Sequence, residues 1–188
     1  MVGHLLGRIL GLIFAILGTF APGAYLATSR APRLGLVAVV MTVLGSALFL
    51  PFQGISTFAL PKEGQAYLAG IEEEYHKLPS NFADTVFIAT SLVVIVLTFV
   101  GNVLLGVAIW RSGTLPKWAG AIWGASAVFV YLLSAVWFLI AGAQVTPPTV
   151  LVGMALLVIS GAWIAWSVLS RPSTAQAAGG TAAEPRVR

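Results

Sequence analysis

The run TVFIATSLVVIVLTFVGNVLLGVAIW, residues 85–110, decides the fold because it contains no charged side chain over its whole length. A helix of about 20 predominantly apolar residues crosses the hydrocarbon core of a bilayer, where an unpaired charge is costly. Three further stretches, residues 9–29, 34–61 and 118–170, also lack Asp, Glu, Lys and Arg. The sequence therefore predicts a protein that crosses a membrane several times.

The overall composition supports a membrane protein. Hydrophobic residues make up 59% of the chain and charged residues 9%, against about 25% charged residues in a typical soluble domain. Cysteine is absent, which excludes disulfide bonds, thiolate metal sites and thiol redox catalysis. The net charge is +4, but the basic residues are scattered at the ends of the apolar stretches. We expect them to set membrane topology and not to bind nucleic acid.

The predicted fold class is all-α: a polytopic membrane helical bundle with five transmembrane helices in one membrane domain, residues 1–170. The run 118–170 is too long for one span, and Pro147 and Pro148 divide it because two consecutive prolines cannot continue a helix. The predicted spans are about 5–27, 34–58, 84–110, 118–142 and 148–170. Residues 171–188 are rich in Ala, Gly and Thr and predict a disordered cytoplasmic tail.

The distribution of Lys and Arg predicts the orientation. One side of the membrane would hold Arg30, Arg33, Arg111, Lys117, Arg171, Arg186 and Arg188, and the other Arg8, Lys62 and Lys77. The positive-inside rule then places the protein in the plasma (inner) membrane with its N-terminus outside and its C-terminus in the cytoplasm. Arg111 and Lys117, together with the flanking Trp110 and Trp118, are the predicted interface anchors.

The turn RSGTLPKWAG, residues 111–120, resembles a turn of the form Arg-Ser-Gly-x-Leu-Pro-Lys-Trp-x-Gly in small uncharacterised bacterial membrane proteins, the DUF4386-like group. The resemblance covers this turn and its two flanking spans. It implies a multispan bacterial membrane protein and brings no catalytic residue. The residues themselves predict a tight hairpin, because Gly113 suits a left-handed helix cap and Pro116 suits the first turn of the next helix.

Two stretches of the chain resemble each other. Gly18 and Gly23 precede Pro32-Arg33-Leu34-Gly35, just as Gly101 and Gly106 precede Pro116-Lys117-Trp118-Ala119-Gly120, and Gly45-Ser46-Ala47 matches Leu133-Ser134-Ala135 farther on. Two interpretations stay open. The helix pairs are either a parallel repeat, as some transporters contain, or similar only because apolar helices share a biased composition.

Small residues recur at every fourth position along the first span. They are Gly7, Gly11, Ala15, Thr19 and Gly23, and a shorter pair, Gly120 and Gly124, lies in the fourth span. Small side chains allow helix backbones to approach closely in lipid. The stripe therefore predicts a helix-packing seam, either against the protein's own helices or against another membrane subunit.

The one substantial polar loop follows the second span, and residues 62–78 predict an amphipathic helix on the outer membrane surface. Glu72 and Glu73 precede His76 with the Glu-x-x-His spacing of metal-binding helices, and Asp84 follows. These four residues are the candidates for catalysis. The chain lacks the matching second histidine, so a solvated helix face is the competing interpretation and we predict no metal or cofactor.

Inside the membrane, Asn102, Gln53 and Tyr131 are the candidates for a ligand contact or an interhelical polar contact. Three functions stay open. The protein is a non-catalytic accessory subunit or assembly factor of a bacterial membrane complex, a carrier or binder of a small apolar ligand or lipid, or a membrane enzyme that uses the outer-loop cluster. The expected partners are the lipid bilayer and other membrane subunits bound through the first helix.

Overall fold

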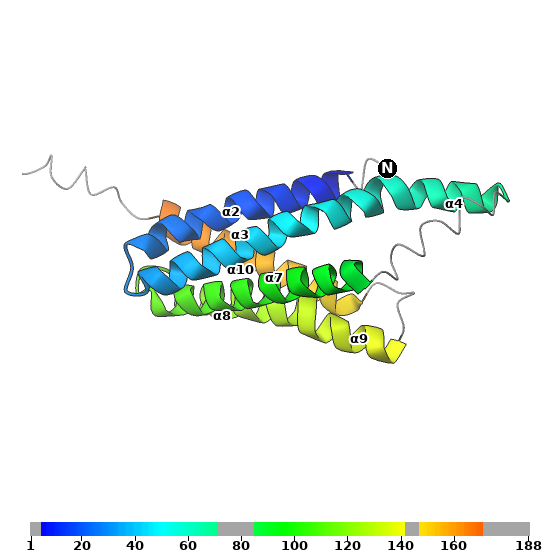
Figure 1. The fold of residues 1–188 in the computed structure, drawn as a ribbon. Helices are drawn as coiled ribbons and strands as arrows, with labels where there is room; N and C mark the ends of the chain where they lie inside the picture. Colours follow the sequence, from blue (N-terminus) through cyan, green and yellow to red (C-terminus); the bar gives the residue numbers. More distant parts are fainter. Residues whose placement is uncertain (1–4, 71–84, 142–146, 171–188) are drawn as a thin grey trace, which may run out of the picture.

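The computed structural model describes residues 5–70, 85–141 and 147–170, which are helical apart from short turns (Figure 1). Five of the helices are long and apolar enough to cross a membrane. They are Leu5–Ala27, Pro32–Ala59, Thr85–Ser112, Lys117–Ala141 and Pro148–Leu169. The predicted all-α bundle is confirmed, and each helix begins and ends within two residues of the position expected from the charge pattern.

Three of the five spans change between α- and π-helical geometry along their length. The elements in chain order are η1 (Leu5–Leu10), α2 (Gly11–Ala27), α3 (Pro32–Gly54), η2 (Ile55–Ala59), α4 (Leu60–Leu68), α7 (Thr85–Arg111), α8 (Lys117–Ala127), η3 (Val128–Leu133), α9 (Ser134–Ala141) and α10 (Pro148–Leu169). Pro22 and Pro51 lie inside α2 and α3, and both helices continue past them. Pro148 begins α10. Proline is tolerated there because the N–H groups of the first helical turn have no acceptor within the helix.

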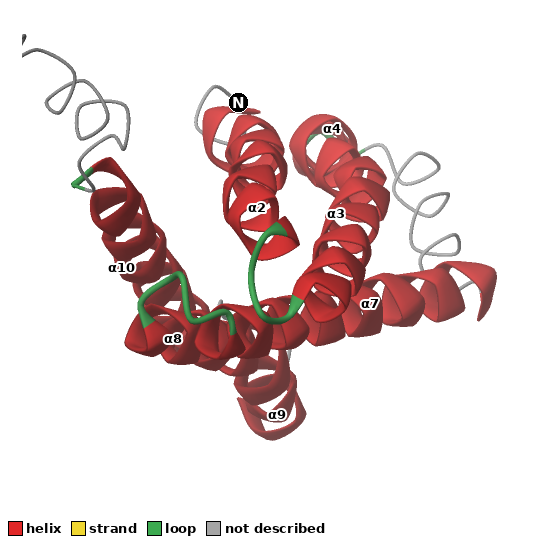
Figure 2. Cartoon of the chain, turned by 90° about the vertical axis from the view of Figure 1, so that its left-hand side faces the viewer, coloured by secondary structure: helices red, strands yellow, loops and turns green. Residues whose placement is uncertain are grey.

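The helices form a row in the order of the chain. α2 packs on α3, α3 on α7, α7 on α8, and α8 on α10. The row is curved, and α2 and α10 stand apart as its two edges (Figure 2). In the described part of the chain, each edge helix therefore has one main neighbour, whereas the inner helices each have two.

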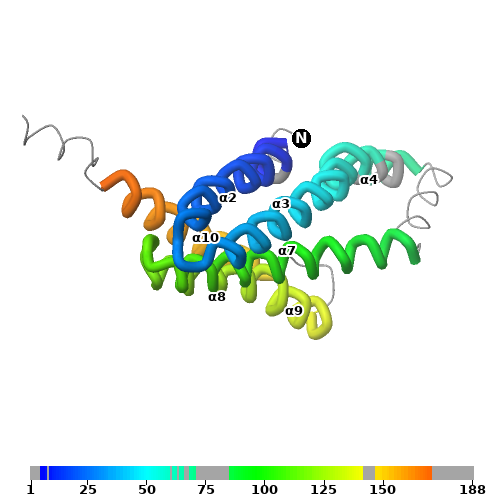
Figure 3. The backbone as a smooth tube through the Cα atoms, turned by 60° about the vertical axis from the view of Figure 1, so that its left-hand side comes forward, coloured from blue at the N-terminus to red at the C-terminus, as the bar shows by residue number. Residues whose placement is uncertain are grey.

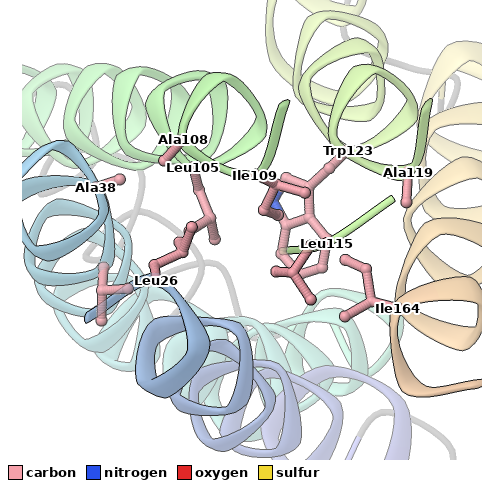
Figure 4. Close-up of a cluster of buried hydrophobic side chains, with 10 residues drawn as sticks. Leu26, Ala38, Leu105, Ala108, Ile109, Leu115, Ala119, Trp123 and Ile164 are labelled. Atoms are coloured by element: carbon pink, nitrogen blue, oxygen red, sulfur yellow. The ribbon is translucent and has the colours of Figure 1, made fainter. Parts of the chain in front are cut away.

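Both hairpin turns lie at the same end of the bundle (Figure 3). The backbone N–H of Arg30, between α2 and α3, donates a hydrogen bond to the carbonyl of Ser112, between α7 and α8, at 3.3 Å. The buried core also includes residues from this end, where Leu115 of the second turn packs with Trp123 and Ile164 (Figure 4). The α2–α3 and α7–α8 hairpins are thus parallel to each other.

The outer loop begins differently from its prediction. α4 follows η2 without a break and continues the line of α3 away from the other helices (Figure 1). The helix ends at Leu68, and the N–H of Ala69 donates the last helical hydrogen bond to the carbonyl of Gln65. The helix does not continue because Gly70 has a φ of 75°. The continuous helix predicted over 62–78 is therefore wrong at this point, and the remainder of that prediction, residues 71–78, lies outside the described residues. A glycine in the left-handed conformation is a common helix end, and the helical wheel was wrongly continued through it.

Candidate functional site

The outer-loop candidates Glu72, Glu73, His76 and Asp84 lie outside the described residues, so the structure does not place them. The functional surfaces that can be described are those of the membrane-spanning helices. Three features stand out among them: a polar contact between α7 and α8, the joined hairpin turns, and the glycine-rich faces of α2 and of the α7–α8 pair.

Asn102 connects two neighbouring helices. Its Nδ2 group donates to the carbonyl of Thr98 at 2.9 Å within α7, and its Oδ1 atom accepts a hydrogen bond from Trp123 Nε1 of α8 at 3.1 Å. An amide in an apolar interior needs such partners. Asn102 was a candidate from the sequence but Trp123 was not. Tryptophan is common both in protein cores and at membrane interfaces, so its position in the sequence does not indicate a polar contact.

Asn102→Leu should destabilise the bundle by about 1–2 kcal/mol, because it removes an interhelical hydrogen bond and leaves the Trp123 indole N–H without its acceptor. The free energy of unfolding in detergent, followed by circular dichroism, measures the effect. In a Trp123→Phe background the same substitution should cost much less. Fully additive losses in the double variant would contradict this coupling.

Gln53 and Tyr131 do not join Asn102 in one polar site. Tyr131, on η3, packs edge-on against Phe99 with ring centroids 6.3 Å apart. Gln53 is half-buried on α3, and its Oε1 atom has no hydrogen-bond partner among the described residues. No hydrogen bond connects the three side chains in the described part of the chain, so they do not form a single ligand site there.

The two hairpin turns share one serine motif. Ser112 Oγ donates to the carbonyl of Ile109 at 2.8 Å and accepts the N–H of Leu115 at 3.1 Å. Ser29 Oγ likewise donates to Leu26 at 2.8 Å and accepts the N–H of Ala31 at 3.1 Å. Four exposed cations surround these turns: Arg30, Arg33, Arg111 and Lys117. Residues 5–62 and 85–170 contain no Asp or Glu that could neutralise them.

The small-residue stripe of the first span is divided. Its C-terminal part packs on α3, since Thr19 is buried and a methyl group added at Gly23 would lie 3.0 Å from Val39 Cγ2. Its N-terminal part forms, with Gly18, a set of exposed small residues that we call the open face of α2. These residues are Gly7, Gly11, Ala15 and Gly18. A methyl group added at Gly7 or Gly18 would meet no atom within 4 Å in the described structure.

The two hairpins are packed by matching contacts. Gly23 faces Val39 in the first, and Gly106 faces Gly124 in the second. A second pair of contacts matches in the same way, since Gly35 lies against Leu26 and Gly120 lies against Ile109. The matched positions are 83 residues apart in the first helix of each hairpin and 85 apart in the second. These contacts support the parallel-repeat interpretation.

A groove of about 480 Å³ runs along the contact between α7 and α8. It is lined by α7 between Val103 and Arg111 and by α8 between Gly120 and Val128. The Trp110 and Trp118 rings meet edge-to-face near Arg111, with centroids 5.3 Å apart. The groove is therefore apolar along its length and has a cation at one end.

No family model matches the chain, and no curated protein or solved structure is significantly similar to it. The resemblance of the turn at residues 111–120 to the DUF4386-like group therefore stays a prediction. The fold defines the class: an all-α bundle of helices long and apolar enough to span a membrane. The function has to be argued from the packing surfaces.

Proposed function

We propose that the protein is a non-catalytic accessory subunit or assembly factor of a bacterial membrane complex, and that a transmembrane helix of another chain packs on the open face of α2. The observation that supports this most strongly is the uncovered glycine surface at one edge of the helix row. Close helix packing in lipid depends on such small residues. Gly45, Gly101 and Gly106, by contrast, each lie against a neighbouring helix.

The second hairpin supports this proposal by analogy. α7 has two packed neighbours, and its Thr98 and Gly101 lie against α3. The residues 83 positions earlier are Ala15 and Gly18, which lie on the open face of α2. Within the described chain no other span precedes the one formed by η1 and α2, so this surface has no partner helix there. By analogy with α7, we propose that it accepts a helix with a small residue at the crossing point.

The proposed orientation places the joined turns in the cytoplasm of the cell and the N-terminus outside the plasma membrane. It is supported by the four cations that surround these turns, since basic residues are retained on the cytoplasmic side. The orientation is independent of the proposed docking surface. It predicts that a cysteine introduced at Thr28, an exposed residue of the turn between α2 and α3, would react with an impermeant maleimide only after the membrane is opened.

Gly18→Leu should reduce association with the partner at least tenfold, because a large side chain on the open face prevents close approach of the second helix. The measurement is the fraction of protein in the higher-mass species on a native gel of mildly solubilised membranes. Gly161→Leu is the matched control, since a methyl group at Gly161 also meets nothing within 4 Å and α10 lies at the other edge of the row from α2.

The absence of cysteine makes a decisive cross-linking test possible. A single cysteine in place of the exposed Phe14, one turn before Gly18, is labelled with a benzophenone maleimide and should on illumination form a cross-link to a different chain. Quantitative dimers of twice the protein's own mass would instead show a homodimer surface and refute the accessory-subunit proposal. The accessory-subunit proposal would also be refuted if the wild-type protein migrated only as a monomer.

The carrier alternative is favoured by one observation, the apolar groove between α7 and α8. The enzyme alternative depends on side chains outside the described residues.

A further inference from the structure

We infer that the α7–α8 groove binds one acyl chain of an anionic phospholipid whose phosphate contacts Arg111 and Lys117. This site is separate from the open face of α2 and does not depend on the proposed docking there. It would make a specific phospholipid an integral part of the bundle.

The groove exists because glycines bring the two backbones into contact. A methyl group added at Gly106 would lie 2.7 Å from the Gly120 carbonyl oxygen, and one added at Gly120 would lie 2.7 Å from the Trp110 nitrogen. At Gly124, by contrast, an added methyl group meets no atom within 4 Å, although the residue lines the groove. The contact line is therefore filled by backbone, and the space beside it is left without a side chain.

The dimensions fit a single hydrocarbon chain. The groove offers about 480 Å³ of space along one side of the α7–α8 contact. From Val103 to Arg111, α7 rises about 12 Å at 1.5 Å per residue. This is close to the depth of one leaflet, roughly 15 Å. A transmembrane helix of another chain is about 10–12 Å wide. It would cross both leaflets, so its contact with α7 and α8 would extend beyond this stretch.

The charges at the end of the groove select the headgroup. Arg111 lines the groove, and Lys117 lies at the other end of the same turn. The Trp110–Trp118 pair beside them is typical of the depth at which headgroups lie. No acidic residue of α7, of α8 or of their connecting turn neutralises these cations. A phosphate would supply the missing negative charge through charge-assisted hydrogen bonds.

The test is native mass spectrometry of the full chain, released from nanodiscs that contain equal amounts of phosphatidylglycerol and phosphatidylcholine. The wild type should retain phosphatidylglycerol in preference. Gly124→Leu fills the groove and should retain at least fivefold less of it. Arg111→Gln with Lys117→Gln should still retain lipid but lose the headgroup preference, by about fivefold for each cation. Gly18→Leu is the control and should bind lipid as the wild type does.

Three outcomes would overturn the inference. Undiminished phosphatidylglycerol binding by Gly124→Leu would place the lipid elsewhere, and an unchanged preference in the double variant would exclude the two cations. A shift from oligomer to monomer in Gly124→Leu would mean that a helix of another chain occupies the groove. Gly124→Val, a smaller filler, should give an intermediate loss if the Leu variant folds poorly. The Gly18→Leu result tests the docking proposal alone, so the two failures are distinguishable.

Discussion

Gly45→Val should lower the free energy of unfolding by about 3 kcal/mol or more and disrupt the central helix pair of the bundle. Gly45 is buried where α3 crosses α7. A methyl group added there would contact Thr98 Oγ1 and lie 2.8 Å from the Thr98 nitrogen and 2.9 Å from its Cα atom. Because the obstacle is backbone and not a flexible side chain, α7 itself would have to move.

Gly54→Val is the matched control for this prediction. Gly54 lies in the same helix, and a methyl group added there meets no atom within 4 Å. It should therefore change stability by no more than a few tenths of a kcal/mol, the amount by which Gly and Val differ in helix propensity. Thermal or SDS-induced unfolding in detergent, followed by circular dichroism, measures both variants. Equal losses in the two would show that close packing at Gly45 is not the cause.

The same crossing contains a second glycine on the opposite helix. A methyl group added at Gly101 would lie 2.6 Å from the Thr42 nitrogen, so α3 and α7 approach each other through a glycine from each side. Gly101→Val should be about as destabilising as Gly45→Val. The two losses should not add in the double variant, because once one substitution has separated the helices the other meets little resistance.

The positions of the five helices could be predicted from the sequence because hydrocarbon excludes charge so strongly. The run 85–110 and its three counterparts have sharp ends marked by Arg, Lys, Asp or Pro. The order of the row was not predictable in this way. All five spans are apolar on most of their surface, so periodicity does not show which face of a helix meets which neighbour.

The spacing of glycines in the sequence does not predict which of them pack against another helix. The regular stripe on the first span is the most conspicuous pattern, yet its Gly7 and Gly11 pack on no other helix in the described chain. Close backbone contacts are made instead by glycines outside this stripe, such as Gly45 and Gly101. Whether a glycine is packed depends on where two helices cross, and crossing points follow from the complete three-dimensional arrangement.

Polar partners were harder to predict than polar candidates. Asn102 could be singled out because an amide in hydrocarbon must be satisfied, but its acceptor role toward Trp123 depends on the register of α7 against α8. That register is set by the contact between Gly106 and Gly120. The resemblance between the two hairpins was visible in the sequence through the same glycines, and the matching contacts support the repeat interpretation over shared composition.

The paired serines of the two turns provide the second large effect. Ser112→Ala should cost about 2 kcal/mol, because the buried N–H of Leu115 would lose its acceptor and no side chain would replace it. Ser112 is completely buried, and its carbonyl also accepts the hydrogen bond from Arg30 that joins the hairpins. Loss of the turn geometry would therefore weaken the contact between the two hairpins.

Ser29→Ala is the natural control because Ser29 Oγ also donates to the carbonyl three residues earlier and accepts a backbone N–H from the turn that follows, here that of Ala31. Ser29 is only half-buried, so water can solvate the Ala31 N–H once the hydroxyl is gone, and the loss should stay below about 1 kcal/mol. Thermal unfolding of the two single variants measures the difference. If local turn formation dominated, the two losses would be equal. A larger loss for Ser112→Ala would mean that burial determines how much each serine contributes to the free energy of unfolding. Similar serine hydrogen bonds in the two hairpins would then stabilise the protein to different extents.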